Sequence, residues 1–236
     1  MTTLRNQERF RIQSGVFDEF TFRNLFELQS RGIYDELIGP IQEGKESKVF
    51  LAKKDNSKII VKIYFVQNCD FNKMYEYIRQ DPRYEYLKKH RRDIILAWAQ
   101  REYRNLIYAQ RAHINAPKPI TWRQNIIVEE MIGDKDPAPP LKDAIPQNPK
   151  KFLEEIIKQM KGLYQQGLVH GYLSAFNILN YKNKPFIIDF SQGTVVKTPN
   201  SEELLRRDIK NVLQFFRKLG INADVEETFI KVVGKK

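Results

Sequence analysis

The sequence predicts an α+β fold with two lobes, a small one rich in strands and a larger one that is mainly helical. Runs rich in β-branched residues at 48–53 and 58–65 lie in the first half of the chain, whereas amphipathic helical patterns at 150–167 and 201–220 lie in the second half. The segment between them, 133–149, carries five prolines and no apolar periodicity, which is typical of a connector between two lobes.

Composition excludes several classes of protein. The chain has 236 residues, of which 42% are hydrophobic and 29% are charged, as in a globular protein with a sizeable core. No run approaches the roughly 18 apolar residues of a membrane helix, and the start, "MTTLRNQERFRIQSG", lacks the apolar core of a signal peptide. The three histidines show no zinc-ligand spacing. The single cysteine, Cys69, excludes an intramolecular disulfide and favours a reducing compartment, so we expect a cytoplasmic protein without a membrane segment.

The chain is strongly basic, with 40 Lys and Arg residues against 29 Asp and Glu residues and a net charge of +11. This balance favours polyanionic partners, which include nucleic acids and nucleotide phosphates. A basic surface that only keeps the protein soluble has the same composition, so charge alone leaves both interpretations open.

The first elements are a helix and a hairpin. Apolar residues at helical spacing predict a helix over 19–38, which Gly32 interrupts or ends. Two strands follow at 48–53 and 58–65, joined by a turn at "KDNS". We therefore predict that an N-terminal helical extension, residues 1–38, precedes the hairpin.

A long insertion separates this hairpin from the next helix. Residues 66–90 are polar and aromatic and are broken by Pro82, so this segment is predicted to be irregular and flexible. A helix is predicted over 91–112, and a short strand at "NIIVEEM" follows a loop marked by prolines. The small lobe would therefore span 39–132.

The large lobe would span 133–236 and begins with the connector. The apolar residues of its first helix, at 150–167, fall on one stripe: Phe152, Ile156, Met160 and Leu163. Gly167 is placed to end this helix. Two short strands at 177–180 and 185–190 precede a last amphipathic helix at 201–220.

The stretch "GPIQEGKES" has glycines at the spacing of a Walker phosphate loop. Gly39, Gly44 and Lys45 match G-x-x-x-x-G-K, but Glu46 stands where the magnesium-binding Ser or Thr should follow, and Ser47 comes one place late. The stretch also opens a hairpin, whereas a Walker loop opens a helix. A phosphate-covering loop between antiparallel strands is the arrangement of protein kinases. A plain turn without a ligand remains an alternative.

One lysine and one glutamate are predicted to pair. Lys62 lies inside the strand "IIVKIY", where a kinase places the lysine that holds the nucleotide phosphates and pairs with a helix glutamate. Glu102 falls on the apolar face of the helix predicted over 91–112, and a carboxylate there is costly unless a cation satisfies it. The alternatives are an edge lysine in water and a glutamate that reaches the solvent.

The stretch "HGYLSAFN" has the form of a kinase catalytic loop. His170 and Asn177 have the separation of H-R-D-x-x-x-x-N, but the position of the catalytic aspartate is Tyr172. Asp189 ends the apolar run "FIID" 12 residues after Asn177, where a kinase delivers a metal-binding aspartate. An aspartate at a strand end is also a common turn residue.

Taken together, these blocks resemble the RIO family of atypical serine/threonine protein kinases, in the branch without an N-terminal winged-helix domain. "GKESKVFLA", "IVKIY", "REYRNL", "HGYLSAFNIL", "IIDFSQG" and "LLRRDIKNVLQFF" resemble family blocks in the correct order, from about residue 38 to 232. The resemblance implies a bilobal protein-kinase-like fold with reduced activation and substrate-docking segments. It also implies that 66–90 is the flexible loop of the family.

The resemblance implies ATP and Mg²⁺, with Mn²⁺ as an alternative ion. The nucleotide would be contacted by Gly44, Lys45, Glu46, Ser47, Val49, Lys62, Glu102, Glu130 and Ile132. Lys62 would anchor the phosphates with Glu102 as its partner, and the adenine would meet backbone groups of the "EEMIG" stretch. Asn177 and Asp189 would hold the metal, and Asp189 is also implied as an acceptor of phosphate. The implied role is maturation of the small ribosomal subunit, with pre-ribosomal particles and their RNA as partners and ATP hydrolysis as the important activity.

Three departures from the family pattern stand beside this resemblance. A phenol, with a reference pKa of about 10, cannot replace a carboxylate as a base near neutral pH, which puts turnover in doubt at Tyr172 but leaves nucleotide binding intact. Glu129 stands where the family has an apolar residue beside the adenine. The segment 66–90 contains no Ser or Thr, which excludes a phosphoserine switch there. Two interpretations stay open: a serine/threonine kinase or ATPase impaired by Tyr172, and a pseudokinase that docks on pre-ribosomal RNA–protein particles under nucleotide control.

Overall fold

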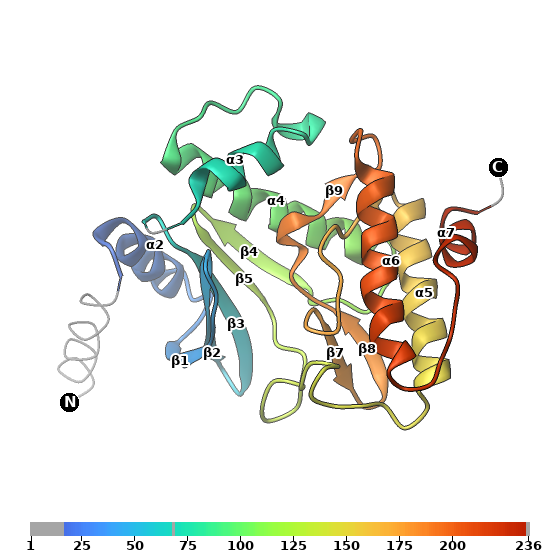
Figure 1. Cartoon of the computed structure of the whole chain (residues 1–236). Helices are drawn as coiled ribbons and strands as arrows, with labels where there is room; N and C mark the ends of the chain where they lie inside the picture. The colour runs from blue at the N-terminus through green and yellow to red at the C-terminus, as the bar shows by residue number, and fades with distance from the viewer. Residues whose placement is uncertain (1–16, 68, 235–236) are drawn as a thin grey trace.

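The computed structural model describes residues 17–67 and 69–234. One part is a twisted sheet with a helix on its outer face, and the other is a helical part that follows it in the chain (Figure 1). The predicted α+β class with a strand-rich first part and a helical second part is confirmed. No helix within the described ranges has the length and apolar character needed to cross a membrane.

The small lobe is built on one antiparallel sheet with the strand order β1-β2-β3-β5-β4. Its strands are β1 (Glu36–Glu43), β2 (Ser47–Lys54), β3 (Ser57–Tyr64), β4 (Pro119–Arg123) and β5 (Ile126–Glu130). Strand β3 lies in the centre, and its residues 59–64 are all buried, as the run of Ile and Val residues in its sequence requires. Because β3 is paired on both sides and buried, the position of Lys62 on this strand is fixed by the sheet.

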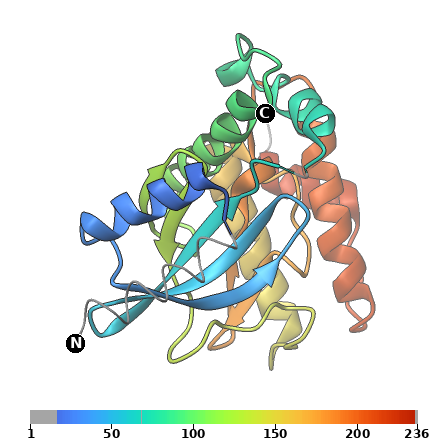
Figure 2. The ribbon, with the colours of Figure 1, turned by 90° about the vertical axis from the view of Figure 1, so that its left-hand side faces the viewer.

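Helix α2 (Glu19–Ser30) covers the outer face of this sheet (Figure 2). It begins at Asp18, whose carboxylate accepts a hydrogen bond from the backbone N–H of Thr21 (2.9 Å). The helix ends at Ser30, and the chain turns through Gly32 in the left-handed region (φ 69°), which confirms the prediction that Gly32 interrupts or ends the helix. Residues 36–38 belong to β1, so the helical prediction is wrong there.

The insertion at 66–90 contains structure that the sequence did not predict. Helix α3 (Phe71–Ile78) and the short 3₁₀ turn η1 (Pro82–Tyr84) occupy much of it. Met74 and Ile78 are buried in the core cluster that also includes the apolar face of α4, the next helix along the chain. The segment is therefore not irregular over α3, because these apolar side chains, spaced one turn apart, pack against α4.

The large lobe is mainly helical, as predicted. Its helices are α5 (Pro149–Gln165), α6 (Ser201–Arg217) and α7 (Val225–Val233), and its short strands are β6 (Leu168–Val169), β7 (Ile178–Tyr181), β8 (Lys184–Ile187) and β9 (Thr194–Val195). Helix α7 packs on α5 and α6 (Figure 1) and was not predicted. The connector 133–149 forms only isolated bridges before α5 begins, in agreement with its proline content.

Candidate active site

Three charged side chains from three distant parts of the chain meet between the lobes. The Nζ atom of Lys62 lies 2.8 Å from a carboxylate oxygen of Glu102 and 2.8 Å from one of Asp189. Lys62 comes from β3, Glu102 from α4 (Arg91–Arg111), and Asp189 from the turn after β8. The predicted ion pair between Lys62 and Glu102 is confirmed.

Both oxygens of the Glu102 carboxylate have a partner. Its second oxygen accepts a short hydrogen bond from the hydroxyl of Tyr64, which lies two residues after Lys62 on the same face of β3. Burial raises the pKa of Glu102, and the Lys62 ammonium opposes this rise. Burial also works against the charge on Lys62, but the carboxylates of Asp189 and Glu102 outweigh it and raise the pKa of Lys62 well above its usual value. The lysine is therefore a permanent cation held by two anions.

Asp189 has a backbone conformation that few residues adopt. Its φ is 61° and its ψ is 69°, in the left-handed region, directly before a 3₁₀ turn at Phe190–Gln192. This conformation turns the chain sharply and brings the carboxylate to Lys62. Although burial opposes its ionisation, the Lys62 ammonium lowers the pKa of Asp189 to about 2, so this carboxylate is ionised at neutral pH.

Helix α4 holds this turn from the other side. Nη2 of Arg101 donates to the carbonyl of Ser191 (2.6 Å), and Nδ2 of Asn105 donates to the carbonyl of Phe190 (2.9 Å). Both side chains are fully buried. The sequence interpretation used Glu102 from this helix and missed Arg101 and Asn105. The available signal was that Arg101 and Asn105 lie four residues apart on the predicted helix, at positions that place polar side chains inside the fold, where they need hydrogen-bond partners.

The loop at residues 170–177 is fixed by its own hydrogen bonds. His170 is buried, which lowers its pKa to about 4, so its ring is neutral at physiological pH. Its Nε2–H donates to the carbonyl of Ile188 (3.0 Å), and its Nδ1 accepts from the backbone N–H of Tyr172 (3.3 Å). Nδ2 of Asn177 donates to the carbonyl of Tyr172 (2.9 Å). His170 and Asn177 therefore both hold the backbone at residue 172.

Asp208 of α6 is the residue that anchors this loop, and the sequence interpretation missed its role. Its two oxygens accept from the backbone N–H groups of Gly171 (2.7 Å) and Leu173 (2.8 Å). Burial raises its pKa to about 7, while these two N–H groups favour the ionised form. The available signal was the position of Asp208 on the apolar stripe of its helix, between Leu205 and Ile209. A carboxylate buried there needs hydrogen-bond donors, which predicts a structural role.

Tyr172 lies at the position where the resemblance places a carboxylate. Its side chain is 50% exposed. Its hydroxyl makes no hydrogen bond to another described residue, and the structure offers no other carboxylate from the 170–177 loop in its place. The loop is thus fixed by several hydrogen bonds and carries a phenol at residue 172.

The loop between β1 and β2 closes over the charged cluster. The backbone N–H of Gly44 donates to the carbonyl of Ser47 (2.9 Å), which forms a tight turn. Glu46 is half-buried, and burial and the nearby Asp189 carboxylate raise its pKa. Lys45 is exposed. The turn joins two antiparallel strands and opens no helix, so the Walker interpretation is wrong.

An apolar floor lies beside the charged cluster on the same face of the sheet. It consists of Val49, Leu51, Ile60 and Met131. Glu130 and Ile132 lie at its edge, where β5 passes into the connector. The backbone N–H of Glu130 donates to the carbonyl of Lys118 (2.9 Å), and the carbonyl of Ile132 accepts from the N–H of Ala138 (2.8 Å).

Glu129 is a buried carboxyl group on this floor. It pairs in register with Ile60 and is only 9% exposed. No described residue makes a hydrogen bond to its side chain. Burial and the negative charge of Glu102 raise the pKa of Glu129 to about 8, and the Lys62 ammonium opposes this rise. The environment of Glu129 therefore favours its protonated form over its ionised form.

Two side chains of this site, Asn177 and Asp189, have oxygens that could bind a hard cation such as Mg²⁺. They would supply only part of its coordination. Because Nδ2 of Asn177 is bound to the backbone, its carbonyl oxygen is the free end of the amide. Asp189 adds an ionised carboxylate. No group of three or more His, Cys, Asp and Glu side chains among the described residues could hold a metal by itself. Mg²⁺ suits such a site, since it is commonly bound by one or two protein oxygens together with substrate phosphates.

Comparison with known proteins gives consistent matches over the chain. The RIO domain model of protein families matches residues 48–228. The RIO-type serine/threonine-protein kinase Rio1 of Haloferax volcanii is 37% identical over 98% of this chain and 80% of its own. The protein of the same name from Methanocaldococcus jannaschii is 39% identical over 97% of this chain and 79% of its own.

Solved structures share the fold at lower identity. The crystal structure of the Rio2 kinase–ADP/Mg²⁺–phosphoaspartate complex from Chaetomium thermophilum superposes with a TM-score of 0.69 at 18% identity, over 91% of this chain and 66% of that chain. A crystal structure of Rio2 kinase from the same organism gives a TM-score of 0.68 at 20% identity, over 91% of this chain and 68% of that chain. This similarity shows a kinase-like fold, as the motif order predicted.

Proposed function

Since the chain belongs to the RIO domain family, we propose that it binds ATP with Mg²⁺, or with Mn²⁺, as a RIO-type serine/threonine kinase or ATPase. The observation that carries this proposal is the contact of Lys62 with two carboxylates, that of Glu102 from α4 and that of Asp189 from the turn after β8. A buried lysine that stays charged suits the α and β phosphates of a nucleotide. When phosphates arrive, Lys62 keeps Glu102 as its partner and exchanges Asp189 for them.

The remaining residues would act around this anchor. Asn177 and Asp189 would hold the metal, which neutralises charge on the phosphates. Gly44 and Glu46 would cover the phosphates from above, together with Lys45 and Ser47. Val49 and the apolar floor would face the base, and backbone groups near Glu130 and Ile132 would contact its edge. The Rio2 complex contains a phosphoaspartate, and we propose Asp189 as the carboxylate of this chain that accepts phosphate.

Turnover depends on residue 172. The attacking hydroxyl or water must lose a proton, and a positioned base typically contributes about 10² to 10⁴ in rate. Tyr172 supplies a phenol in place of the carboxylate, so we propose that this chain binds ATP well and turns it over slowly. The same observation favours the second candidate, a pseudokinase in which nucleotide binding controls docking on a partner.

The proposed partners are pre-ribosomal small subunits and their RNA. The net charge of +11 supports a polyanionic partner, because cations that replace the counterions of phosphates contribute strongly to affinity. We further propose that the protein works in the cytoplasm, to which the lone Cys69 is suited.

Calorimetry of ATP binding in the presence of Mg²⁺ tests the nucleotide site. The chain should bind ATP, and Lys62→Met should weaken binding at least tenfold, since it removes the cation that contacts the phosphates. Lys58→Met is the matched control, because Lys58 lies on the same strand with its Nζ near Asp136 (3.3 Å), away from the cluster. A folded chain that binds no ATP would exclude both candidate functions.

A further inference from the structure

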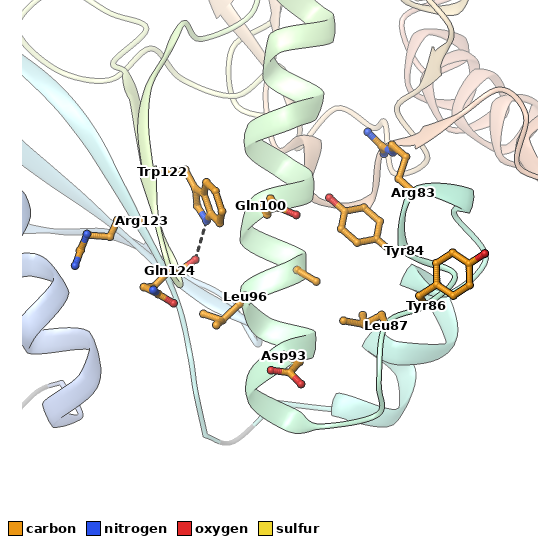
Figure 3. A pocket seen from close by; sticks show the side chains of 11 residues that line it. Arg83, Tyr84, Tyr86, Leu87, Asp93, Leu96, Gln100, Trp122, Arg123 and Gln124 are labelled. Atoms are coloured by element: carbon orange, nitrogen blue, oxygen red, sulfur yellow. Dashed lines mark hydrogen bonds between the residues drawn. The ribbon is translucent and has the colours of Figure 1, made fainter.

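A hollow of about 550 Å³ lies on the far side of α4 from the Lys62 cluster. Figure 3 shows its construction: Leu96 and Gln100 of α4 line its middle, Trp122 comes from the β4–β5 hairpin on one side, and Tyr84 and Tyr86 come from the insertion on the other. Nothing in the proposed nucleotide site uses this hollow. It is lined by three aromatic side chains from two separate segments.

The aromatic rings are presented in a fixed arrangement. Nε1 of Trp122 donates to the carbonyl of Gln124 (2.8 Å), and its ring packs against Tyr103 with the centroids 6.4 Å apart. Tyr86 is 90% exposed, which leaves most of a large aromatic side chain in water. Tyr84 is 7% exposed, and its buried hydroxyl has no hydrogen-bond partner among the described residues. Because this hydroxyl is enclosed, Tyr84 contributes to the wall of the hollow and does not present a polar group to a ligand.

A run of cations borders the hollow at the start of α4. Residues 88–92, "KKHRR", are all exposed. None of Lys88, Lys89, Arg91 and Arg92 forms an ion pair with a carboxylate in the described chain. Instead, Arg91 lies over the ring of Phe71 (5.2 Å) and Arg92 over that of Phe20 (4.1 Å), so their charges stay open to solvent.

The charge balance beside the hollow favours anions. Residues 83–93 contain five Lys and Arg side chains, of which Arg83 is paired with Asp81 (2.6 Å), so four cations stand against the two carboxylates of Glu85 and Asp93. The N-terminus of α4 lies in this stretch, and no side chain caps it. Its free backbone N–H groups add to the positive potential. Phosphate groups along a chain would therefore find several donors within a short distance.

We propose that this surface, formed by residues 88–92 and the hollow lined by Tyr84, Tyr86 and Trp122, binds single-stranded RNA. Bases would stack on Tyr86 and Trp122, and the phosphates would lie along 88–92. Stacking platforms beside cations are the usual means of holding single strands, and a duplex keeps its bases out of reach. The inference rests on the proposed function, which makes RNA a partner, and it adds the place on the molecule and the form of the RNA.

Fluorescence anisotropy with a labelled single-stranded RNA of about twelve nucleotides tests this inference at low and moderate salt. Changing Lys88, Lys89, Arg91 and Arg92 together to Gln should weaken binding and reduce the slope of log affinity against log salt by up to about 3, at roughly 0.7 per lost phosphate contact. Tyr86→Ala should weaken binding about 5- to 150-fold, the range found for one stacked base. Because Tyr86 is almost fully exposed, this variant is expected to fold, and unchanged ATP affinity would verify it.

The matched control removes the same charge from the other lobe. Lys150, Lys151, Lys158 and Lys161 of α5 are exposed, and changing all four to Gln should alter binding much less than the α4 variant does. If both quadruple variants lose equal affinity, or if Tyr86→Ala binds like the parent chain, the location is wrong. If the parent chain binds no RNA at low salt, the RNA part of the proposed function fails as well. If a polyglutamate peptide binds as tightly as the RNA, the surface is a site for acidic peptides and the inference is overturned.

Discussion

Tyr172 lies between Gly171 and Leu173, whose backbone N–H groups both donate hydrogen bonds to the carboxylate of Asp208. The backbone at residue 172 is therefore positioned by contacts that do not involve its own side chain. A carboxylate placed there would enter a loop that is already organised, because His170 and Asn177 also bind its backbone. The chemistry at this position can thus be changed without rebuilding the loop.

Tyr172→Asp should raise ATPase or autophosphorylation rates by about 10² to 10⁴, since it supplies the missing general base. ATP affinity should change little, because Lys62 and Asp189 are untouched. Steady-state turnover beside calorimetry measures the two effects separately. Phe176→Asp is the control, since it adds the same charge at another exposed aromatic residue of this loop.

Two outcomes would contradict this assignment. If the parent chain already turns over ATP as fast as Tyr172→Asp, residue 172 does not hold the position of the base. If Tyr172→Asp remains inactive while ATP still binds, the pseudokinase interpretation gains, and Glu129 becomes the next departure to revert.

Glu129 should make stability depend on pH. Its pKa is about 8 in the folded chain against an ordinary value of 4.5, with Lys62, Glu102 and Asp189 as the charged groups around it. Between these pH values the folded chain holds a proton that the unfolded chain has released, so this stability is lost as pH rises from about 4.5 to 8. Glu129→Gln should remove the share of this dependence that comes from Glu129, while Asp208 keeps its own, and the variant should be more stable than the parent at pH 8, by a few kcal/mol at most. Urea unfolding at pH 5 and pH 8 measures this, and a difference that does not grow with pH would contradict it.

The site residues that could be predicted are those whose order and spacing along the chain carry the signal. Lys62 and Glu102 were found because each is a charged side chain inside an apolar pattern, and they do pair. Tyr64 and Asp208 were missed because their importance comes from a partner far away in sequence. A tyrosine in a strand is ordinary, and only the folded structure shows its hydroxyl on Glu102.

At the level of elements, the insertion carries more order than its polar sequence indicated. Ile78→Ala removes a fully buried side chain where α3 packs on α4, and it should lower the free energy of unfolding by about 2–5 kcal/mol. Asn72→Ala is the control, since Asn72 is an exposed residue of the same helix and should change stability by less than about 0.5 kcal/mol. Urea unfolding of both variants is the measurement. Equal small effects would show that α3 does not pack in solution and would support the flexible loop expected from the sequence.

The elements that escaped prediction have weak local patterns. Strand β1 contains Gly39 and Pro40 and is mostly exposed, so its strand character comes from pairing with β2. Strand β4 includes one irregular step in its pairing with β5, between Pro119 and Thr121, and it begins at a proline. Helix α7 is only 9 residues long, too short for its periodicity to stand out from the sequence. By contrast, α4, α5 and α6 have long apolar stripes and were predicted within a few residues.

For the whole molecule, one core cluster crosses from lobe to lobe. It includes Tyr64, Ile95 and Ile127 of the small lobe together with Leu153 and Phe216 of the large lobe. We therefore expect a single unfolding transition by calorimetry, with a calorimetric enthalpy that equals the van't Hoff enthalpy. ATP with Mg²⁺ should shift the whole transition upward, by about 2.7 kcal/mol of stability at a hundredfold excess over Kd. Two separate transitions, with only one responding to ATP, would contradict this shared core.

The same shared core limits how this chain can be divided. The connector 133–149 links the lobes by backbone, but the buried contacts of α4 with the turn after Asp189 do not depend on it. A chain cleaved in the connector would stay together as a non-covalent complex, whereas either fragment alone would expose apolar surface that its partner normally covers. The lobes are therefore not interchangeable modules. A chimaera with one lobe from a relative must bring matching residues on both sides of this boundary, and substitutions there would be tolerated only in compensating pairs.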